Sequence, residues 1–310
     1  MGSADFRGSA AWVMIDPQGG AVPRFSRRAF FEKAAAGAAV AGIYSAGSEL
    51  RAGPLGLPVG SQTWPHRQRV RSGDLAGLCK NLAALGVGTL ELCSPGYPEF
   101  SGLADGKQTR KIIEDQGLKC PSAHFTMEEM RTSQQRMIAW AKDIGMTQMG
   151  VATLAEGPKG GKTTMDAVKR AADEYNRIGE TAAAAGIVQF LHDEQFEAAQ
   201  ADGRLVYEIL IERLEPKYVK FQYQMSAMPQ VGDVVAYFTK YPGRFISMHL
   251  QGVDLKAANP KAPLAVGKDA VDWTKVFAAA KTGGVQNYFV EQGWDVTVKS
   301  VAFLKTLNTT

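Results

Sequence analysis

Cysteine is scarce in this chain of 310 residues, and its three cysteines form no pattern typical of a covalent or metal framework. Their number is odd and no Cys-x-x-Cys pair occurs, which excludes a disulfide scaffold and a thiolate metal site. Cys79 falls in an expected helix, and Cys93 and Cys120 fall at the ends of expected strands. We therefore expect all three to be small, buried apolar side chains.

Long runs of one charge and long apolar segments are also missing. The formal net charge is +4 and no basic run follows the N-terminal region, so the composition gives no support for a nucleic acid partner or a membrane-surface partner. No stretch is long and apolar enough to predict a transmembrane helix, and we expect no stable membrane insertion. Hydrophobic residues make up 45% of the chain, which is enough for a sizeable core.

Two nucleotide-binding motifs are absent as well. No GxGxxG follows the first expected strand, which argues against a dinucleotide-binding sheet. The segment GPKGGKTT at residues 157–164 looks superficially like the end of a phosphate loop, but Glu156 stands where that motif needs its first glycine. We interpret the segment as a flexible loop between a strand and a helix, and as a candidate lid.

The first 50 residues indicate an export signal and a linker. Residues 26–33, SRRAFFEK, resemble the twin-arginine export motif, and an uncharged stretch rich in alanine and glycine follows at residues 34–47. The resemblance implies export of a folded protein and residence in a bacterial periplasm. An alanine-rich or amphipathic N-terminal helix is the structural alternative.

From Leu57 onward, short β-rich runs alternate with amphipathic helical runs. Strands are expected at residues 57–64, 89–93, 120–125, 148–152, 187–192, 218–224, 245–251 and 286–292. Strict alternation implies parallel strands, because a parallel pair needs a crossover and the crossover is usually a helix. Eight such units in about 250 residues match a closed barrel. We therefore predict an α/β fold, a single (β/α)8 TIM barrel over residues 51–310, with a doubly wound open sheet as the alternative.

Polar residues gather at the ends of the expected strands, which is where such a barrel holds its active site. All four histidines lie at or just past a strand end, namely His66, His124, His192 and His249. The other candidates are Gln62, Trp64, Glu91, Glu194, Gln222, Gln224, Gln251 and Glu291. Imidazoles and carboxylates bind divalent metals, and two carboxylates can remove and return a proton. These residue types suit a small, polyhydroxylated, sugar-like substrate.

Four segments carry a resemblance to a known family. Residues 186–197, 244–251 and 288–291, with VGK before VDW at residues 266–273, look like the xylose isomerase-like TIM barrels. That family includes sugar phosphate isomerases and epimerases, ketose 3-epimerases and inosose dehydratases, and the resemblance runs from about Leu57 to the end of the chain. It implies a divalent metal (Mn²⁺, Mg²⁺, Co²⁺ or Zn²⁺) held by Glu, Asp, His and Glu on the fifth to eighth strands.

The chain follows that ligand pattern only in part. His249 and Glu291 match the last two places, Gln224 replaces the aspartate, and the place on the fifth strand is apolar. Glu194 or Glu197 can supply the missing carboxylate, so the resemblance implies His249, Glu291, Gln224 and Glu194 as the metal ligands. A neutral glutamine is a weaker ligand than aspartate.

We interpret the chain as a sugar isomerase or epimerase that moves a proton next to a carbonyl group. Glu291, with Glu194 or Glu91, would move the proton, and His249 would polarise the carbonyl with or without a metal. The predicted substrate-binding residues are Gln62, Trp64, His66, Glu91, His124, His192, Gln222 and Gln251. A lyase of the inosose dehydratase kind and a non-catalytic carbohydrate-binding barrel are the alternatives, and a homo-oligomer is left open.

Overall fold

Eight parallel strands close into a barrel in the order β1-β11-β10-β9-β6-β4-β3-β2. The computed structural model describes residues 53–194, 196–254 and 264–307, and the export signal predicted within residues 1–50 lies outside them. The strands are β1 Gly60–Gln62, β2 Thr89–Cys93, β3 Lys119–Phe125, β4 Gln148–Val151, β6 Val188–Leu191, β9 Val219–Gln224, β10 Phe245–Leu250 and β11 Asn287–Val290. Pairing of β1 with β11 closes the barrel, which confirms the predicted TIM barrel and excludes the open sheet.

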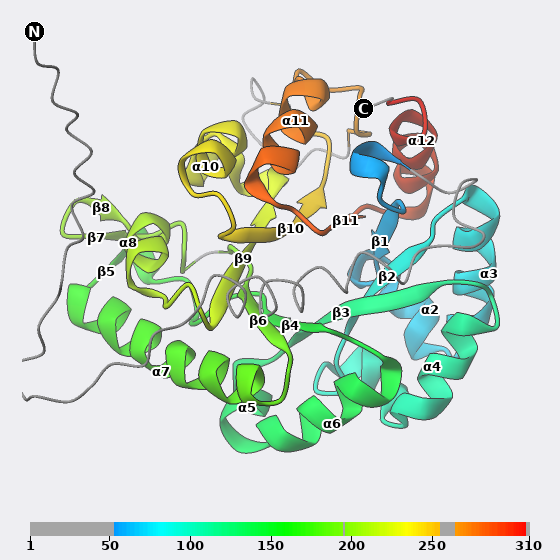
Figure 1. Ribbon diagram of the computed structural model, residues 1–310, viewed down its shortest axis with the longest axis horizontal. Coiled ribbons are helices and arrows are strands. Elements are labelled where there is room, and N and C mark those ends of the chain that lie inside the picture. Colours follow the sequence, from blue (N-terminus) through cyan, green and yellow to red (C-terminus); the bar gives the residue numbers. More distant parts are fainter. Residues whose placement is uncertain (1–52, 195, 255–263, 308–310) are drawn as a thin grey trace, which may run out of the picture. The chain divides into compact units, whose positions relative to one another are not determined.

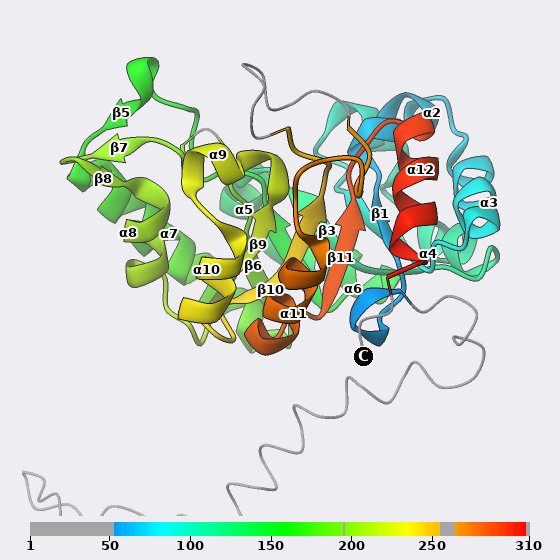
Figure 2. The same ribbon diagram turned by 90° about the horizontal axis from the view of Figure 1, so that it is seen from above.

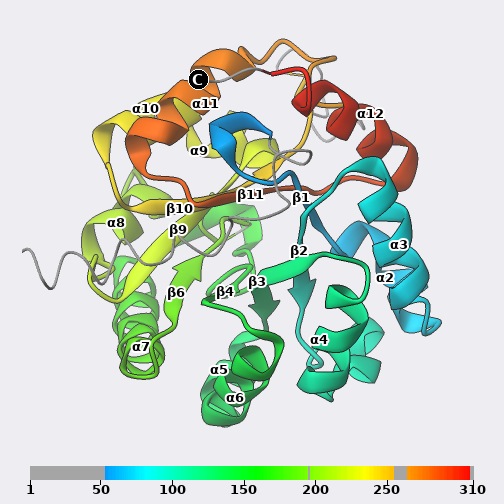
Figure 3. The same cartoon turned by 45° about the vertical axis from the view of Figure 1, so that its right-hand side comes forward.

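Helices between the strands form the outer layer of the barrel (Figures 1 and 3). They are α2 Arg67–Arg71, α3 Leu75–Leu85, α4 Gly106–Glu114, α5 Met127–Thr132, α6 Gln134–Ile144, α7 Met165–Ala184, α8 Val206–Arg213, α9 Met228–Val231, α10 Val234–Lys240, α11 Trp273–Gly283 and α12 Trp294–Leu304. Local sequence explains their ends: Thr126 and Glu129 form a capping box at the start of α5, and Gly86 ends α3 with a φ of 92°. None of the described helices combines the length and the apolar character that a membrane crossing demands.

A small three-stranded sheet stands outside the barrel and was not predicted. It consists of β5 Lys162–Thr163, β7 Gln200–Ala201 and β8 Arg204–Leu205, and it joins the loop after β4 to the loop after β6. Figure 2 shows it beside α8, at one side of the barrel. Part of the segment predicted as a flexible loop is therefore a paired strand, because two-residue strands carry no periodic signal in the sequence.

Two phenylalanines fill the barrel interior and form a floor beneath the carboxyl ends of the strands. Phe190 lies across Gly150, where an added Cβ would come within 2.1 Å of the phenylalanine ring, so only glycine leaves enough space. The His124 ring packs against Phe190 with a centroid distance of 5.8 Å, and the His249 ring meets the edge of Phe289 at 6.3 Å. The apolar place predicted on the fifth strand thus serves packing.

The three cysteines are all buried and unpaired, as predicted. Cys79 packs within α3, Cys120 lies near the start of β3, and Cys93 is the last residue of β2. Burial raises the pKa of each thiol, to about 12 for Cys79. At neutral pH they are therefore protonated apolar side chains without thiolate reactivity.

Candidate active site

A pocket of about 170 Å³ opens at the carboxyl ends of the barrel strands. It is lined by Gln62, Trp64, Cys93, Tyr97, His124, Ala152, His192, Glu194 and Glu291. Several of these residues are the last of a strand or the first after one, as in β1, β2, β6 and β11. Pockets for drug-sized ligands usually measure about 300–1,000 Å³, so this one suits a smaller molecule.

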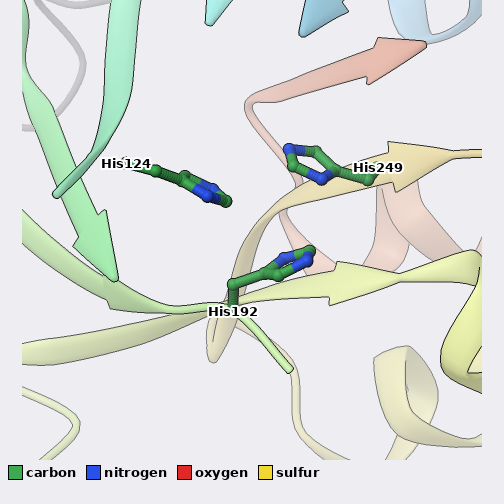
Figure 4. Close-up of side chains that lie close together, drawn as sticks. All are labelled: His124, His192 and His249. Atoms are coloured by element: carbon green, nitrogen blue, oxygen red, sulfur yellow. The ribbon is translucent and has the colours of Figure 1, made fainter. Parts of the chain in front are cut away.

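Three histidines from separate strands face one another at this pocket. Figure 4 shows the rings of His124, His192 and His249, which come from β3, the end of β6 and β10. Their ring centroids are 4.6 Å apart for His192 and His249, and 5.1 and 5.2 Å apart for the other two pairs. All three are buried, and one ring nitrogen of each lies within 4.8 Å of the others, so the group could hold a metal ion.

The fourth histidine lies apart from this group. His66 ends the short 3-10 helix Trp64–His66 after β1, and its ring meets the edge of Trp294 at 6.1 Å. It is buried and is not among the residues that line the pocket. Burial, aided by the nearby positive charge of Arg69, lowers the pKa of His66 to about 4. The structure thus brings together three of the four histidines predicted to converge.

His249 bridges two carboxylates from opposite parts of the sequence. Its Nε2 hydrogen-bonds to Glu91 Oε2, and its Nδ1 lies 3.3 Å from Glu291 Oε2. Burial alone would lower the pKa of His249, but the two negative charges outweigh it and raise the pKa to about 10. Without a bound cation, His249 is therefore a positively charged imidazolium at neutral pH and lies between the carboxylates of Glu91 and Glu291.

Glu91 lies one layer below the pocket and is completely buried. Its Oε1 accepts hydrogen bonds from Ser122 Oγ at 2.7 Å and from Gln222 Nε2 at 2.9 Å. Burial opposes the charge, yet the positive charge of His249 and the hydrogen bonds from His249 and Ser122 lower the pKa of Glu91 to about 2. Glu91 was predicted to contact substrate, whereas here it supports His249 from beneath.

Gln222, also predicted to contact substrate, lies in the same lower layer and fixes the tautomer of His124. Its Nε2 donates to Glu91 and, at 2.9 Å, to Ser247 Oγ. Its Oε1, 2.7 Å from His124 Nε2, must then accept, so His124 carries its proton on Nε2 and keeps Nδ1 as a base. Burial lowers the pKa values of both His124 and His192, and these two rings are neutral.

Glu291 supplies an ionised carboxylate to the pocket wall. Its Oε2 accepts hydrogen bonds from Gln224 Nε2 at 2.8 Å and from Gln251 Nε2 at 2.9 Å. Burial raises its pKa, but the positive charge of His249 and these donors reverse the shift and hold the pKa of Glu291 below its ordinary value. Gln224 and Gln251 therefore orient the carboxylate, and Gln251 is not among the residues that line the pocket.

The ligand set implied by the family resemblance does not form an oxygen-rich metal shell. Gln224 turns its Nε2 donor toward Glu291, and its Oε1 is buried without a hydrogen-bond partner. Glu194 lies on the pocket wall, where its carboxylate is 3.9 Å from His192 Nε2. Mg²⁺ and Mn²⁺ prefer carboxylate, carbonyl and water oxygens, whereas here Gln224 presents an amide donor and Glu291 Oε2 is already occupied by the amide donors of Gln224 and Gln251.

Glu197 is a buried carboxyl group that joins the loops after β4 and β6. Its Oε1 accepts from Leu154 N at 2.9 Å, and its Oε2 accepts from Thr153 Oγ1 at 2.8 Å and from Glu194 N at 3.2 Å. Burial raises the pKa of Glu197 to about 7 despite these hydrogen bonds. Of the two alternatives for a pocket carboxylate, Glu194 lines the pocket and Glu197 holds its loop in position.

The burial of Glu197 predicts a pH-dependent stability. Between pH 4.5 and about 7 the folded state keeps a proton that the unfolded chain releases, so the free energy of unfolding falls as the pH rises. We expect Glu197→Gln to remove a decline on the order of 3 kcal/mol over this window, measured by urea unfolding at pH 5 and pH 8. If the free energy of unfolding changed equally between pH 5 and pH 8 in wild type and variant, this would contradict the raised pKa of Glu197.

An aromatic wall borders the pocket on the side of β1 and β2. Trp64 is 36% exposed and stacks parallel to Phe100 at 6.4 Å, while Tyr97 meets its edge at 5.7 Å. Gln62 accepts from the backbone N–H of Trp64 and places its Nε2 3.6 Å from Cys93 Sγ. Tyr97 was not predicted, because it follows a turn well past the end of β2 and only its aromatic character hints at a role.

Searches against protein-family models and against curated proteins found no match to this chain. Solved structures do resemble it. A sugar phosphate isomerase/epimerase from Parabacteroides distasonis has a TM-score of 0.67 at 21% identity, covering 81% of this chain and 94% of its own. D-allulose 3-epimerase from Methylomonas sp. has a TM-score of 0.57 at 14% identity, covering 79% and 89%. The probable 3-DHS dehydratase AsbF of petrobactin synthesis from Bacillus anthracis has a TM-score of 0.61 at 10% identity, covering 81% and 100%.

These similarities agree with the resemblance seen in the sequence. Proteins described as a xylose isomerase domain protein and as a xylose isomerase-like TIM barrel fusion are also among the similar structures. At such low identities the likeness establishes the barrel fold, and the chemistry must be argued from the pocket itself.

Proposed function

We propose that this chain is an isomerase or epimerase of a small sugar or sugar derivative, and that it transfers a proton at a carbon next to a carbonyl group. The observation that carries this proposal is the presence of two carboxylates, Glu194 and Glu291, in the wall of one small pocket that also contains buried imidazoles. Paired carboxylates can remove a proton from one face of a carbon and return one to the other. The sugar epimerases among the structural neighbours support the same reaction class.

Glu291 is the base in this proposal, because its lowered pKa keeps it ionised at neutral pH. Removal of the proton leaves negative charge on the carbonyl oxygen, and the positive charge held at His249 between two carboxylates stabilises it. Glu194 follows β6, which β9 and β10 separate from β11 in the barrel order, so the two carboxylates approach a bound molecule from different directions.

The remaining pocket residues suit a polyol. Trp64 contributes an aromatic side chain to the pocket wall, against which the carbon-hydrogen groups of a sugar can pack. Gln62, His124 and His192 offer neutral donors and acceptors for hydroxyls. We also propose a periplasmic location, on the resemblance of residues 26–33 to the twin-arginine motif.

A lyase reaction is the second candidate, and the similarity to a probable dehydratase favours it. It begins with the same removal of a proton next to the carbonyl. The hydroxyl group on the next carbon then leaves as water, with its proton supplied by a protonated side chain of the pocket wall such as Glu194.

Product analysis tests the proposal. The purified full chain is incubated with a panel of ketoses, aldoses and keto-sugars. The products are separated by chromatography, and their molecular masses are measured by mass spectrometry. We expect an isomer of unchanged mass, and loss of one water would instead identify the lyase. Saturable sugar binding with neither product would contradict both and identify a non-catalytic carbohydrate-binding barrel. A Glu114→Gln variant, which alters an exposed carboxylate of α4, serves as the control.

A further inference from the structure

The three-histidine group contains buried nitrogens that the protein itself does not satisfy. Nδ1 of His192 is buried and has no hydrogen-bond partner, and Nδ1 of His249 is buried with the Glu291 carboxylate 3.3 Å away but without hydrogen-bond geometry. A buried polar atom without a partner is unfavourable, because it has lost its hydrogen bonds to water. Two such atoms in one cluster of three rings point to a ligand that takes electron pairs from them.

The group also has the outer partners that metal-binding histidines need. A ligating histidine almost always donates its other ring N–H to a nearby acceptor, which fixes the tautomer and the ring orientation. His249 Nε2 hydrogen-bonds to the carboxylate of Glu91, and His124 Nε2 hydrogen-bonds to the amide oxygen of Gln222 at 2.7 Å. Because Ser122 and Gln222 in turn hold Glu91, the orientations of the His124 and His249 rings are fixed from below.

The distances allow one ion with a modest inward movement. Zn²⁺–N bonds measure about 2.0–2.1 Å, so two nitrogens on a tetrahedral ion lie roughly 3.3 Å apart. The ligand atoms of the three histidines lie within 4.8 Å of one another. Small rotations of the rings that move each nitrogen by on the order of 1 Å would bring all three to bonding distance of one ion. His124 and His192 line the pocket, so a fourth coordination position would face a bound molecule.

We propose that His124, His192 and His249 form a metal centre selective for an ion that prefers imidazole, Zn²⁺ or Co²⁺, over Mg²⁺. Once His249 releases its proton to solvent on metal binding, the three imidazoles match the ligand preference of these ions, and Mg²⁺ demands oxygen ligands. A bound cation takes over the positive charge that protonated His249 otherwise provides between Glu91 and Glu291. Metal binding is measured without any sugar, so its failure and the failure of the proposed reaction are distinguishable.

Direct metal binding tests this centre. The full chain is purified without a polyhistidine tag, stripped with a chelator and dialysed against Zn²⁺, Co²⁺ or Mg²⁺, with elemental analysis and the visible absorption of the Co²⁺ form as readouts. The variants are His192→Ala and His124→Ala. The controls are His66→Ala, a buried histidine outside the group, and Gln224→Ala, which removes a ligand implied by the family resemblance but absent from this set.

We expect wild type and both controls to bind one equivalent of Zn²⁺ or Co²⁺ and no Mg²⁺ at the same concentration. Loss of an outer partner alone costs 10–100-fold in metal affinity, so loss of a ligand is expected to cost at least about 100-fold. Circular dichroism checks folding, and His192→Asn replaces His192→Ala if the alanine variant unfolds. Binding of Co²⁺ by a folded His192 variant with the wild-type affinity and spectrum, or no binding by wild type, would overturn the proposal.

Discussion

Replacing Glu91 with alanine is expected to lower the free energy of unfolding by about 3–5 kcal/mol, because it breaks a buried ion pair and leaves the buried His249 with only the more distant Glu291 carboxylate. Glu91 is completely buried and pairs with His249, which is also completely buried. The change also leaves the hydroxyl of Ser122 and the amide of Gln222 without their acceptor.

Urea unfolding at pH 7 measures the effect, with Glu114→Ala as the matched control. Glu114 pairs with Arg110 one helical turn away on the surface of α4, where such a pair contributes about 0.3–0.5 kcal/mol. A Glu91→Ala variant as stable as Glu114→Ala would show that the buried array beneath the pocket does not hold the barrel interior together.

Replacing Glu291 with glutamine is expected to lower kcat on the sugar identified by product analysis by about 10²–10⁴-fold, the usual contribution of a positioned base. Glutamine keeps the size of the side chain and an oxygen that can accept from Gln224 and Gln251, but it cannot take a proton. Substrate binding should change little, so we expect kcat to fall while KM stays close to its wild-type value.

Steady-state kinetics of wild type, Glu291→Gln and the surface variant Glu114→Gln make this comparison. We expect the surface variant to match wild type. If Glu291→Gln turned over the substrate at a rate within a few-fold of wild type, another group would have to be the base.

Much of the fold could be predicted because barrel alternation and helix ends leave local signals. The capping box of Thr126 and Glu129 and the glycine at position 86, which ends α3, are signals of this kind. The sheet of β5, β7 and β8 was not predicted, because each strand has only two residues and β5 pairs with a distant part of the chain, although β7 and β8 form a local hairpin.

The candidate site was predictable in its position but not in its layers. Strand-end polarity correctly indicated residues that now line the pocket, such as His124 and Glu291. Glu91 and Gln222 stand two residues before the ends of β2 and β9, which turns them to the same barrel face one layer deeper. The positions of Glu91 and Gln222 relative to the strand ends therefore indicated the deeper layer, but the prediction did not use them. The Glu91–His249 contact joins residues 158 positions apart, and no local pattern records it.

Uptake of solvent deuterium, followed by NMR in D₂O, shows whether the pocket carboxylates transfer a proton next to a carbonyl. We expect wild type to label one carbon beside the carbonyl group of its sugar. We expect Glu194→Gln to label this carbon without forming the epimer, and Glu291→Gln to do neither. Turnover by wild type with no label at that carbon, combined with unchanged turnover by Glu291→Gln, would rule out proton transfer by these carboxylates.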